Sequence, residues 1–275
     1  MISGAKMLTT TLSQRLRSGE FLLGMQSFSG SAAMVEIMGQ AGFDFVMIDL
    51  EHSMIDMEHA AFLVRTADSV DMACLVRVRE NLPLQISRAL ASGADGVIVP
   101  RVNTAAEARS AVRATRLPPL GERRLSADAR HALQRSGAWT DGLRALDERT
   151  VTVALIEDIA GVDAIEEILD VEGIGALLFG PADFGMSIGA ARKGFGGDVE
   201  RATFQAMDHV IACARKRQVP VLTTPILNVL DVENALADLS ARGVRAVLYS
   251  IDTMMTRASL EKLRHAFKTH AASLS

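Results

Sequence analysis

The sequence predicts a (β/α)8 TIM barrel, which is a closed ring of parallel strands surrounded by helices. Short apolar runs alternate with amphipathic segments eight times along the chain, in the order of elements that such a barrel requires. Most of these runs are continuously apolar, as is typical of strands buried on both faces. Aromatic residues make up only 4% of the chain, so the core is filled mainly by aliphatic side chains and methionine. A doubly wound open sheet is the alternative architecture.

The predicted strands are short apolar runs, most of them bounded by polar residues or glycine. They are Leu22–Gln26, Phe45–Asp49, Ala73–Arg77, Gly96–Val99, Thr152–Ile156, Ala176–Phe179, Val219–Thr223 and Ala246–Tyr249.

The predicted helices are segments in which apolar residues recur at three- and four-residue spacing. They are Ser31–Gly39, Met57–Ser69, Leu84–Ala91, Ala105–Thr115, Gly161–Asp170, Glu200–Lys216, Leu230–Ala241 and Thr256–Phe267. A further helix near Thr10–Ser18 is expected to close the floor of the barrel.

One connection is unusually long and joins the fourth predicted strand to the fifth. It runs over Arg116–Arg149 and contains Pro118, Pro119 and the only tryptophan, Trp139. Connections of this length are usually functional or carry short helices of their own. Because no low-complexity linker divides the chain, we expect one domain over residues 1–275.

Charge and composition exclude several classes of protein. The net charge is −4 and no long run of Lys or Arg occurs, so we expect no nucleic-acid partner. No apolar stretch reaches about 18 residues, so no membrane span is expected. The two cysteines, Cys74 and Cys213, lie in apolar segments and are expected to be buried and reduced, as in a cytoplasmic protein.

Polar side chains gather at the ends of the predicted strands. In barrels of this kind the catalytic residues lie at the carboxyl ends of the strands. Among the residues that follow the second, third, fifth and sixth strands are Asp49, Glu51, His52, Arg77, Glu157 and Asp183. These residues are therefore expected to share one mouth of the barrel.

Glu157 and Asp183 follow strands as apolar as VTVALI and GALLFG. A carboxylate in such a place is costly unless a partner binds it, which favours a metal or an arginine over an unpaired surface position. Two carboxylates one strand apart suit Mg²⁺ or Mn²⁺, with other positions open to water and substrate. A 2-oxo acid could fill two of those positions, and the metal would then stabilise its enolate.

Arg77 and His52 are the candidate catalytic side chains. Arg77 could hold the enolate oxygen by charge-assisted hydrogen bonds, although it could instead serve only to pair with Glu51 or Asp49. His52 is the best candidate for proton transfer because the ordinary pKa of histidine lies near neutrality, the alternative being a hydrogen-bonded loop residue. The backbone of Gly180, Pro181 and Ala182 could receive a substrate carboxylate.

At these residues the chain resembles the HpcH/HpaI aldolase family, the metal-dependent pyruvate aldolases related to 4-hydroxy-2-oxoheptanedioate aldolase. The resemblance covers roughly residues 10–265. It is carried by GFDFVMIDLEHS (Gly42–Ser53), LVRV (Leu75–Val78), SGADGVIVPRVNTAAEA (Ser92–Ala108), RLPPLGER (Arg116–Arg123), IEDIAGV (Ile156–Val162) and LDVEGIGALLFGPADF (Leu169–Phe184).

The resemblance implies a role for each candidate residue. Glu157 and Asp183 would bind the metal, Arg77 would stabilise the enolate and His52 would handle protons. The backbone around Ala182 would receive the substrate carboxylate. The family also assembles as hexamers, built as trimers of dimers with an exchanged C-terminal helix.

The chain departs from the family pattern at four places. Ala91 stands where the family has an aspartate that partners the histidine, and Leu155 stands where it has a glutamine. Leu50 replaces a glycine between aspartate and glutamate. Arg124 replaces the glycine after Arg123, which adds a cation that could bind a further substrate carboxylate.

Three functions follow as hypotheses. The first is a 2-oxo-acid aldolase that cleaves or condenses pyruvate with an aldehyde. The second is a citrate synthase of the kind found in siderophore biosynthesis, which joins oxaloacetate to acetyl-CoA. The third is a barrel that binds a keto acid without turnover, which the joint presence of the four candidate residues argues against.

Overall fold

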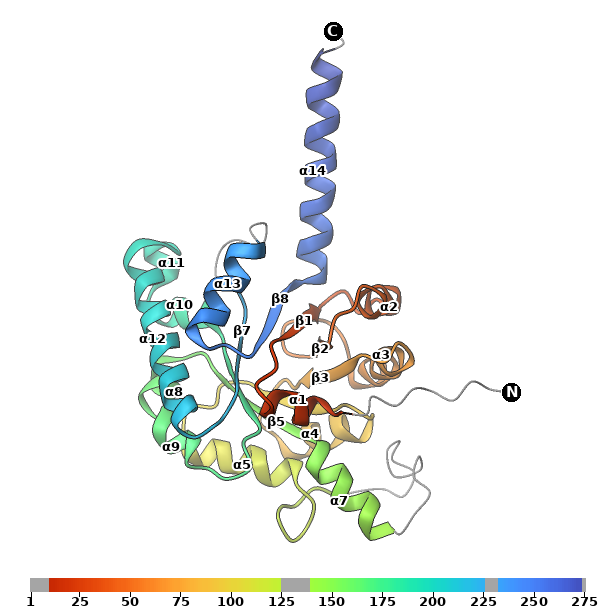
Figure 1. Cartoon of the computed structure of the whole chain (residues 1–275), viewed down its shortest axis with the longest axis vertical. Helices are drawn as coiled ribbons and strands as arrows, with labels where there is room; N and C mark the ends of the chain where they lie inside the picture. Colours follow the sequence, from red (N-terminus) through yellow and green to blue (C-terminus); the bar gives the residue numbers. More distant parts are fainter. Residues whose placement is uncertain (1–9, 125–138, 226–231, 274–275) are drawn as a thin grey trace, which may run out of the picture.

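The computed structural model describes residues 10–124, 139–225 and 232–273. Eight parallel strands form a closed barrel in which each strand pairs with the next and β8 pairs back with β1 (Figure 1). The strands are β1 (Leu22–Ser27), β2 (Phe45–Asp49), β3 (Ala73–Arg77), β4 (Gly96–Val99), β5 (Val151–Ile156), β6 (Ala176–Phe179), β7 (Val221–Thr223) and β8 (Ala246–Ile251). The predicted barrel is confirmed, and the open-sheet alternative is wrong because β1 and β8 are hydrogen-bonded neighbours.

Four strands have their predicted bounds, and the others differ by one or two residues at one end. The strand β7 begins at Val221 and not at Val219. Pro220 has no N–H to donate to a ladder, and only its carbonyl is used, by the N–H of Leu177 at 2.9 Å. The proline therefore delays the start of the strand.

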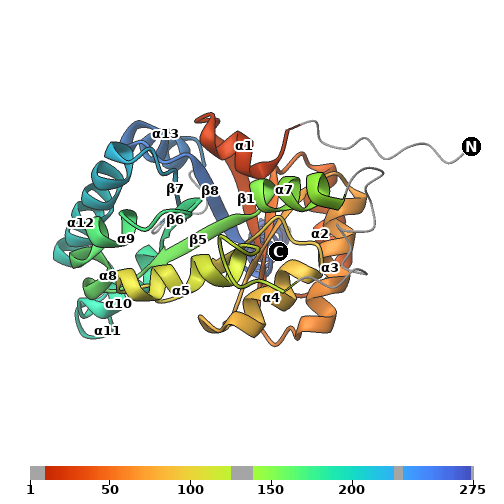
Figure 2. The same cartoon turned by 90° about the horizontal axis from the view of Figure 1, so that it is seen from below.

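The helices form a layer around the outside of the barrel (Figures 1 and 2). In the described residues they are α1 (Leu12–Arg17), α2 (Ala32–Gln40), α3 (Met57–Ser69), α4 (Pro83–Ala91), α5 (Ala105–Thr115), α7 (Trp139–Arg149), α8 (Ile159–Asp163), α9 (Ile165–Leu169), α10 (Pro181–Ser187), α11 (Ala190–Lys193), α12 (Gly197–Lys216), α13 (Val232–Arg242) and α14 (Asp252–Ser273).

Several predicted helices differ in detail from the observed ones. The segment 161–170 falls into two short helices, α8 and α9, which meet at Ala164. The first two residues of the helix predicted over 230–241 lie outside the described residues, as does the middle of the long connection, 125–138. The helix predicted over 256–267 is the middle of the longer α14.

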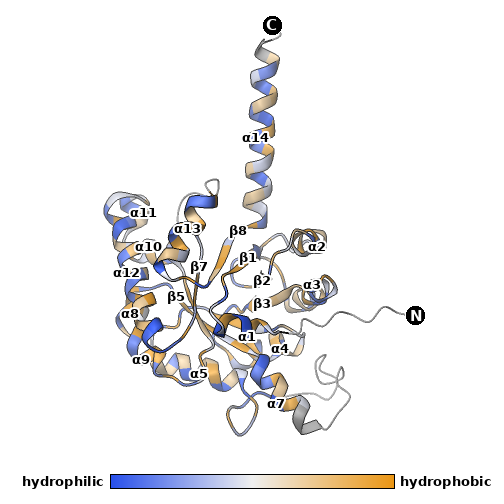
Figure 3. Ribbon diagram, viewed as in Figure 1, coloured by the Kyte–Doolittle hydropathy of each residue, from blue (hydrophilic) through white to orange (hydrophobic). Residues whose placement is uncertain are grey.

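Two apolar cores stabilise the barrel. One fills its interior and includes Leu22, Phe45 and Leu155, while the other lies between the strands and the helices. Figure 3 shows the apolar colour concentrated on the strands and on the inner faces of the helices. Gly24 on β1 makes room for the ring of Phe45, since a Cβ there would lie 2.4 Å from the Cζ atom of that ring.

Helix α1 lies at the amino-terminal end of the strands, as predicted for a floor helix. Thr11 and Gln14 form a capping box at its start. The hydroxyl of Ser13 donates to the carbonyl of Glu148 on α7 at 3.1 Å, and Figure 2 shows the two helices close together.

Helix α14 leaves the barrel directly after β8 and extends away from it (Figure 1). Large apolar side chains are exposed along it, at Leu260 (60%), Leu263 (68%) and Phe267 (68%). In the described part of the chain, no helix combines the length and the apolar character that a membrane crossing needs.

Candidate active site

A cavity of about 470 Å³ lies at the carboxyl ends of the strands. Seven of the eight predicted site residues line it together: His52, Arg77, Glu157, Gly180, Pro181, Ala182 and Asp183. They come from β2, β3, β5 and β6 and from the residues that follow these strands. The parallel topology brings them together, because all eight strands end at the same mouth.

Glu157 follows β5 and is only 4% exposed. The N–H of Arg101 donates to its Oε1 atom at 3.0 Å. Burial raises the pKa of Glu157 to about 7, and the negative charges of Glu51 and Asp183 act in the same direction. Glu157 therefore lies in a place where a nearby positive charge would be strongly favourable.

Arg101 has an unusual backbone conformation at the point where its N–H donates to Glu157. Its φ is 54°, in the left-handed region that residues other than glycine seldom adopt. The backbone of Gly180 also lies close to Glu157, since an added Cβ at Gly180 would lie 3.1 Å from the Cβ of Glu157. The loops after β4 and β6 thus enclose the carboxylate from two sides.

Asp183 lies in the first turn of α10 and is exposed to the cavity. Within residues 10–124, 139–225 and 232–273, no group of three or more His, Cys, Asp or Glu side chains is arranged to hold a metal ion. Glu157 and Asp183 fit a different kind of site, in which two carboxylates hold Mg²⁺ or Mn²⁺ and water and substrate complete the coordination. The mutual repulsion that raises the pKa of Glu157 is the repulsion that such a cation would remove.

Arg77 forms the pair with Asp49 that the sequence allowed, and it also lies at the cavity. Its Nε and Nη2 atoms each donate to the fully buried Asp49 carboxylate at 2.8 Å, and the residue also lines the cavity. Burial works to lower the pKa of Arg77, but the hydrogen bonds and charge of Asp49 outweigh it and raise the pKa above its usual value. The guanidinium is therefore held charged and in a fixed orientation.

Asp49 also fixes the residues that follow β2. It accepts hydrogen bonds from the N–H groups of Glu51 at 2.9 Å and His52 at 3.2 Å. A single buried carboxylate thus fixes Arg77 and the backbone that carries His52. The sequence allows the pair of Arg77 with Asp49, but it gives no sign that Asp49 also fixes the backbone after β2.

Glu51 is the carboxylate nearest to His52. The Nε2 atom of His52 lies 3.8 Å from the Oε2 atom of Glu51, and Arg77 Nη1 lies 3.5 Å from the same oxygen. That oxygen is buried without a hydrogen-bond partner among the described residues. Burial raises the pKa of Glu51 above its usual value. Ala91, by contrast, lies at the exposed C-terminal end of α4, toward the other end of the barrel.

Apolar side chains form much of the rest of the cavity wall. Leu155 and Leu178 lie at its inner end, and Phe28, Tyr249 and Met254 line it from the side of β1 and β8. Leu155 is 1% exposed, so the position where the family has a glutamine is an apolar surface here.

Arg124 is the predicted site residue that does not line this cavity. It is exposed, and its carbonyl accepts a hydrogen bond from Ser87 on α4 at 3.4 Å, in the outer helical layer. The preceding Arg123 is 3% exposed, and burial lowers its pKa to about 10. In this protomer the extra arginine thus lies outside the site that contains Arg77.

Comparisons with known proteins show the family of the chain. Residues 22–256 match the family HpcH/HpaI aldolase/citrate lyase. The chain is 28% identical over 264 residues to a 2-keto-3-deoxy-L-rhamnonate aldolase of Escherichia coli O157:H7, covering 96% of this chain and 95% of the relative.

Two solved structures have the same architecture. The citrate synthase SbnG aligns with a TM-score of 0.82 and 26% identity, covering 95% of this chain and 98% of its own. An HpcH/HpaI aldolase/citrate lyase family protein from Burkholderia cenocepacia J2315 aligns with a TM-score of 0.80 and 30% identity, covering 93% and 98%. The chain therefore belongs to the HpcH/HpaI aldolase/citrate lyase family and is a carbon–carbon lyase of the aldolase type.

Proposed function

We propose that this chain is a divalent-metal-dependent aldolase that forms the enolate of pyruvate or a similar 2-oxo acid and joins it to, or releases it from, an aldehyde. The observation that carries the proposal is the position of Glu157, Asp183 and Arg77 in one cavity. Two carboxylates for a cation and a fixed guanidinium are the charges that a developing enolate requires.

Glu157 and Asp183 are the proposed metal ligands. The family generally depends on a divalent metal, and carboxylate oxygens favour Mg²⁺ or Mn²⁺. When bound, such an ion supplies Lewis-acid polarisation of the keto oxygen of the substrate. Glu157→Ala should abolish metal binding, and calorimetry that found retained tight binding would contradict the assignment.

The protein's own groups then have distinct tasks. Arg77 faces the negative charge that develops on the keto oxygen, and Asp49 keeps its guanidinium from turning away. The backbone from Gly180 to Ala182, at the start of α10, is proposed to receive the substrate carboxylate.

His52 is proposed to carry the proton. Its side chain lines the cavity and is 45% exposed, so it can exchange protons with water as well as with the hydroxyl group that forms or is cleaved. Its carboxylate neighbour is Glu51, which lies on the same loop.

A second candidate function is a condensation of the citrate synthase kind, and the similarity to SbnG over 95% of the chain favours it. Leu155 gives the site an apolar surface where the family has a hydrogen-bonding side chain. Arg124, which would support this candidate by binding a further carboxylate, lies outside the cavity of its own protomer.

One experiment separates the candidates. The protein is incubated with Mn²⁺ and pyruvate in deuterated water, and loss of the methyl proton signal is followed by NMR. Acetyl-CoA and oxaloacetate are supplied in parallel and free thiol is measured. Exchange without thiol release supports the aldolase, thiol release without exchange supports the synthase, and neither activity in the metal-loaded protein would contradict both. A 2-keto-3-deoxy sugar acid is the first cleavage substrate to assay, because the relative from E. coli acts on one.

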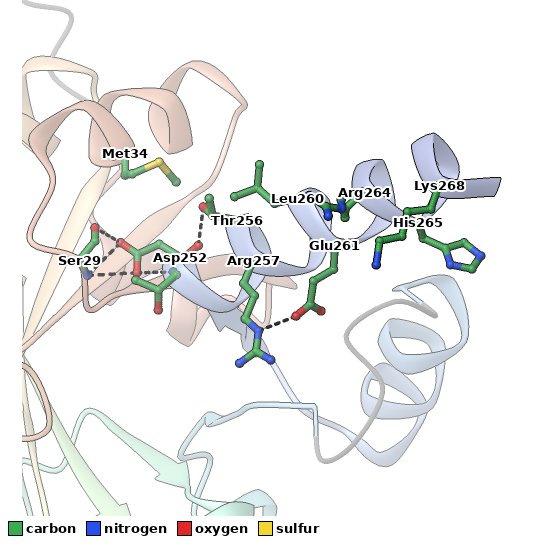
Figure 4. A pocket seen from close by; sticks show the side chains of 11 residues that line it. Ser29, Met34, Asp252, Thr256, Arg257, Leu260, Glu261, Arg264, His265 and Lys268 are labelled. Atoms are coloured by element: carbon green, nitrogen blue, oxygen red, sulfur yellow. Dashed lines mark hydrogen bonds and ion pairs between the residues drawn. The ribbon is translucent and has the colours of Figure 1, made fainter. Parts of the chain in front are cut away.

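We also propose that the protein assembles through α14 as a hexamer, a trimer of dimers. The helix extends from the barrel with Leu260, Leu263 and Phe267 exposed, and a groove of about 760 Å³ lies along its first turns (Figure 4). An exposed apolar stripe of this kind is typical of an interaction surface. A cytoplasmic location is part of the same proposal and rests on the free, buried thiols of Cys74 and Cys213.

A further inference from the structure

The loop after β1 and the start of α14 meet at the carboxylate of Asp252. This side chain is 1% exposed. Its Oδ1 atom accepts from the N–H of Phe28 at 3.0 Å and from that of Thr253 at 2.8 Å. The N–H of Ser29 lies 3.2 and 3.3 Å from the two oxygens, and the Ser29 hydroxyl donates to Oδ2 (Figure 4).

These hydrogen bonds fix the backbone of Phe28, and the ring of Phe28 lies beside Arg77. The ring of Phe28 lies with its centroid 5.8 Å from the guanidinium carbon of Arg77. Asp49 holds Arg77 through its Nε and Nη2 atoms, so the aromatic ring is a separate restraint on the same group. A cation beside an aromatic face is also stabilised electrostatically.

Residues close to Asp252 in the sequence also form part of the wall of the active-site cavity. Ile251 and Met254 lie on either side of Asp252 in the sequence, and both line the 470 Å³ cavity together with Phe28. Asp252 and Ser29 line instead the groove beside α14. A change in the direction of α14 would therefore be transmitted to this side of the active-site wall.

The contacts require a carboxylate at this position. Five donors converge on its two oxygens: three N–H groups and the hydroxyls of Ser27 and Ser29. An asparagine would direct its own NH₂ group at some of these donors and leave them without an acceptor. The charge also lies in the first turn of a 22-residue helix, where a negative group is favourable.

We propose that Asp252 is a positioning residue that holds Phe28 against Arg77 and so links the direction of α14 to the enolate-forming site. The part that concerns Arg77 rests on the proposed aldolase function. Asp252 touches neither the reacting atoms nor the proposed metal ligands, which lie on the other side of the barrel after β5 and β6.

The test compares Asp252→Asn and Ser29→Ala with wild type. Arg257→Ala is the matched control, because this side chain lies on the same helix and pairs only with the exposed Glu261 among the described residues. Amide hydrogen exchange of a peptide covering residues 27–31 reports the geometry without any need for activity. Deuterium exchange into pyruvate reports kcat and KM, and calorimetry with Mn²⁺ reports metal affinity.

We expect Asp252→Asn to speed amide exchange in residues 27–31 and to lower kcat for pyruvate exchange on the order of tenfold, with an unchanged Kd for Mn²⁺. Ser29→Ala, which removes one donor and leaves the carboxylate, should have the same effects to a smaller extent. Arg257→Ala should match wild type in all three measurements.

Two results would overturn the proposal. One is unchanged amide exchange and unchanged kcat in both Asp252→Asn and Ser29→Ala. The other is a parallel loss of Mn²⁺ affinity in Ser29→Ala, which would indicate general damage to the barrel, and this milder variant also decides the matter if Asp252→Asn fails to fold. Absence of pyruvate exchange in wild type would count against the proposed function instead, and the amide-exchange comparison would still test whether Asp252 holds the loop.

Discussion

At the scale of single residues, folding strongly changes the acidity of Glu157. The apolar strand that precedes it, VTVALI, carries it into a place where it is 4% exposed, and two other carboxylates lie near enough to oppose its ionisation. With its pKa of about 7, protons would compete with the proposed metal ion for Glu157 near neutral pH.

This competition gives a prediction for the metal-free protein. A carboxyl whose pKa rises from 4.5 to about 7 on folding binds its proton more tightly in the folded state. Its contribution is therefore fully present below pH 4.5 and is lost as the pH rises through 7, at a cost of about 3 kcal/mol in the free energy of unfolding. Urea unfolding in a chelator at several pH values should show this decline in wild type and a flatter profile in Glu157→Gln. The exposed Glu80→Gln is the control, and identical profiles for wild type and Glu157→Gln would contradict the prediction.

A second residue-scale prediction concerns Arg77. Lysine keeps the charge but cannot donate two parallel hydrogen bonds to Asp49. We expect Arg77→Lys to lower kcat for pyruvate exchange by about 100-fold, while calorimetry finds the affinity for Mn²⁺ unchanged. Arg79→Lys is the matched control, because Arg79 donates to the carbonyls of Leu50 and Ile55 and should affect stability more than turnover. Equal losses of kcat in the two variants would argue against a role at the reacting oxygen.

Part of the site could be predicted from side chains and part could not. Glu157 and Asp183 could be identified because a carboxylate after an apolar strand is costly unless it binds a partner. Arg77 and His52 could be identified because their chemistry suits the mouth of the barrel. The role of the Arg101 N–H could not be predicted, because a main-chain donor is present at every residue except proline. Its left-handed φ is set by the loop. The sequence places Glu51 at the mouth of the barrel. It could not show that Glu51 Oε2 lacks a hydrogen bond among the described residues, because this depends on Arg77 donating to Asp49.

At the scale of elements, α14 is the longest described helix, and it extends away from the barrel. Its apolar positions Leu260, Leu263 and Phe267 follow helical spacing, but they are exposed in the single chain. Helix periodicity predicts that an apolar face exists, and it does not tell which surface covers that face.

We predict that negative charge on this face of α14 disrupts the assembly. Leu263→Glu combined with Phe267→Glu should place charge in the proposed contact and lower the mass measured by light scattering, while the barrel stays folded by circular dichroism. Thr269→Glu introduces the same charge on another face of the helix and should leave the mass unchanged. A mass equal to that of wild type in the double variant would exclude α14 from the assembly contact.

At the scale of the whole molecule, the closed barrel could be predicted because its eight strands repeat one pattern. Strand length and buried hydrophobicity are local properties, and closure follows from their repetition. The exceptions have local causes: the N–H that Pro220 lacks shortens β7, and the interruption at Ala164 divides one predicted helix into α8 and α9.

We predict that the packing of Phe45 in the interior of the barrel contributes strongly to stability. The ring of Phe45 fills the space beside Gly24 and is fully buried, so Phe45→Ala leaves a cavity that the rigid strands cannot close. We expect it to lower the free energy of unfolding by about 3–5 kcal/mol. Phe62→Ala removes the same atoms from a side chain that is 51% exposed and should cost far less. Equal changes in the two variants, measured by urea unfolding, would show that the interior repacks.

The backbone of Arg101 has a consequence for how this enzyme could diversify. Its contribution to Glu157 is made by the main chain, while its guanidinium reaches out to Glu51 at the rim. A glycine or asparagine would adopt the φ of 54° at less cost and still present the same N–H. A lineage could therefore exchange the exposed guanidinium while keeping the N–H that Glu157 accepts. Selection on the side chain and selection on the hydrogen bond to Glu157 would then act on different atoms of one residue.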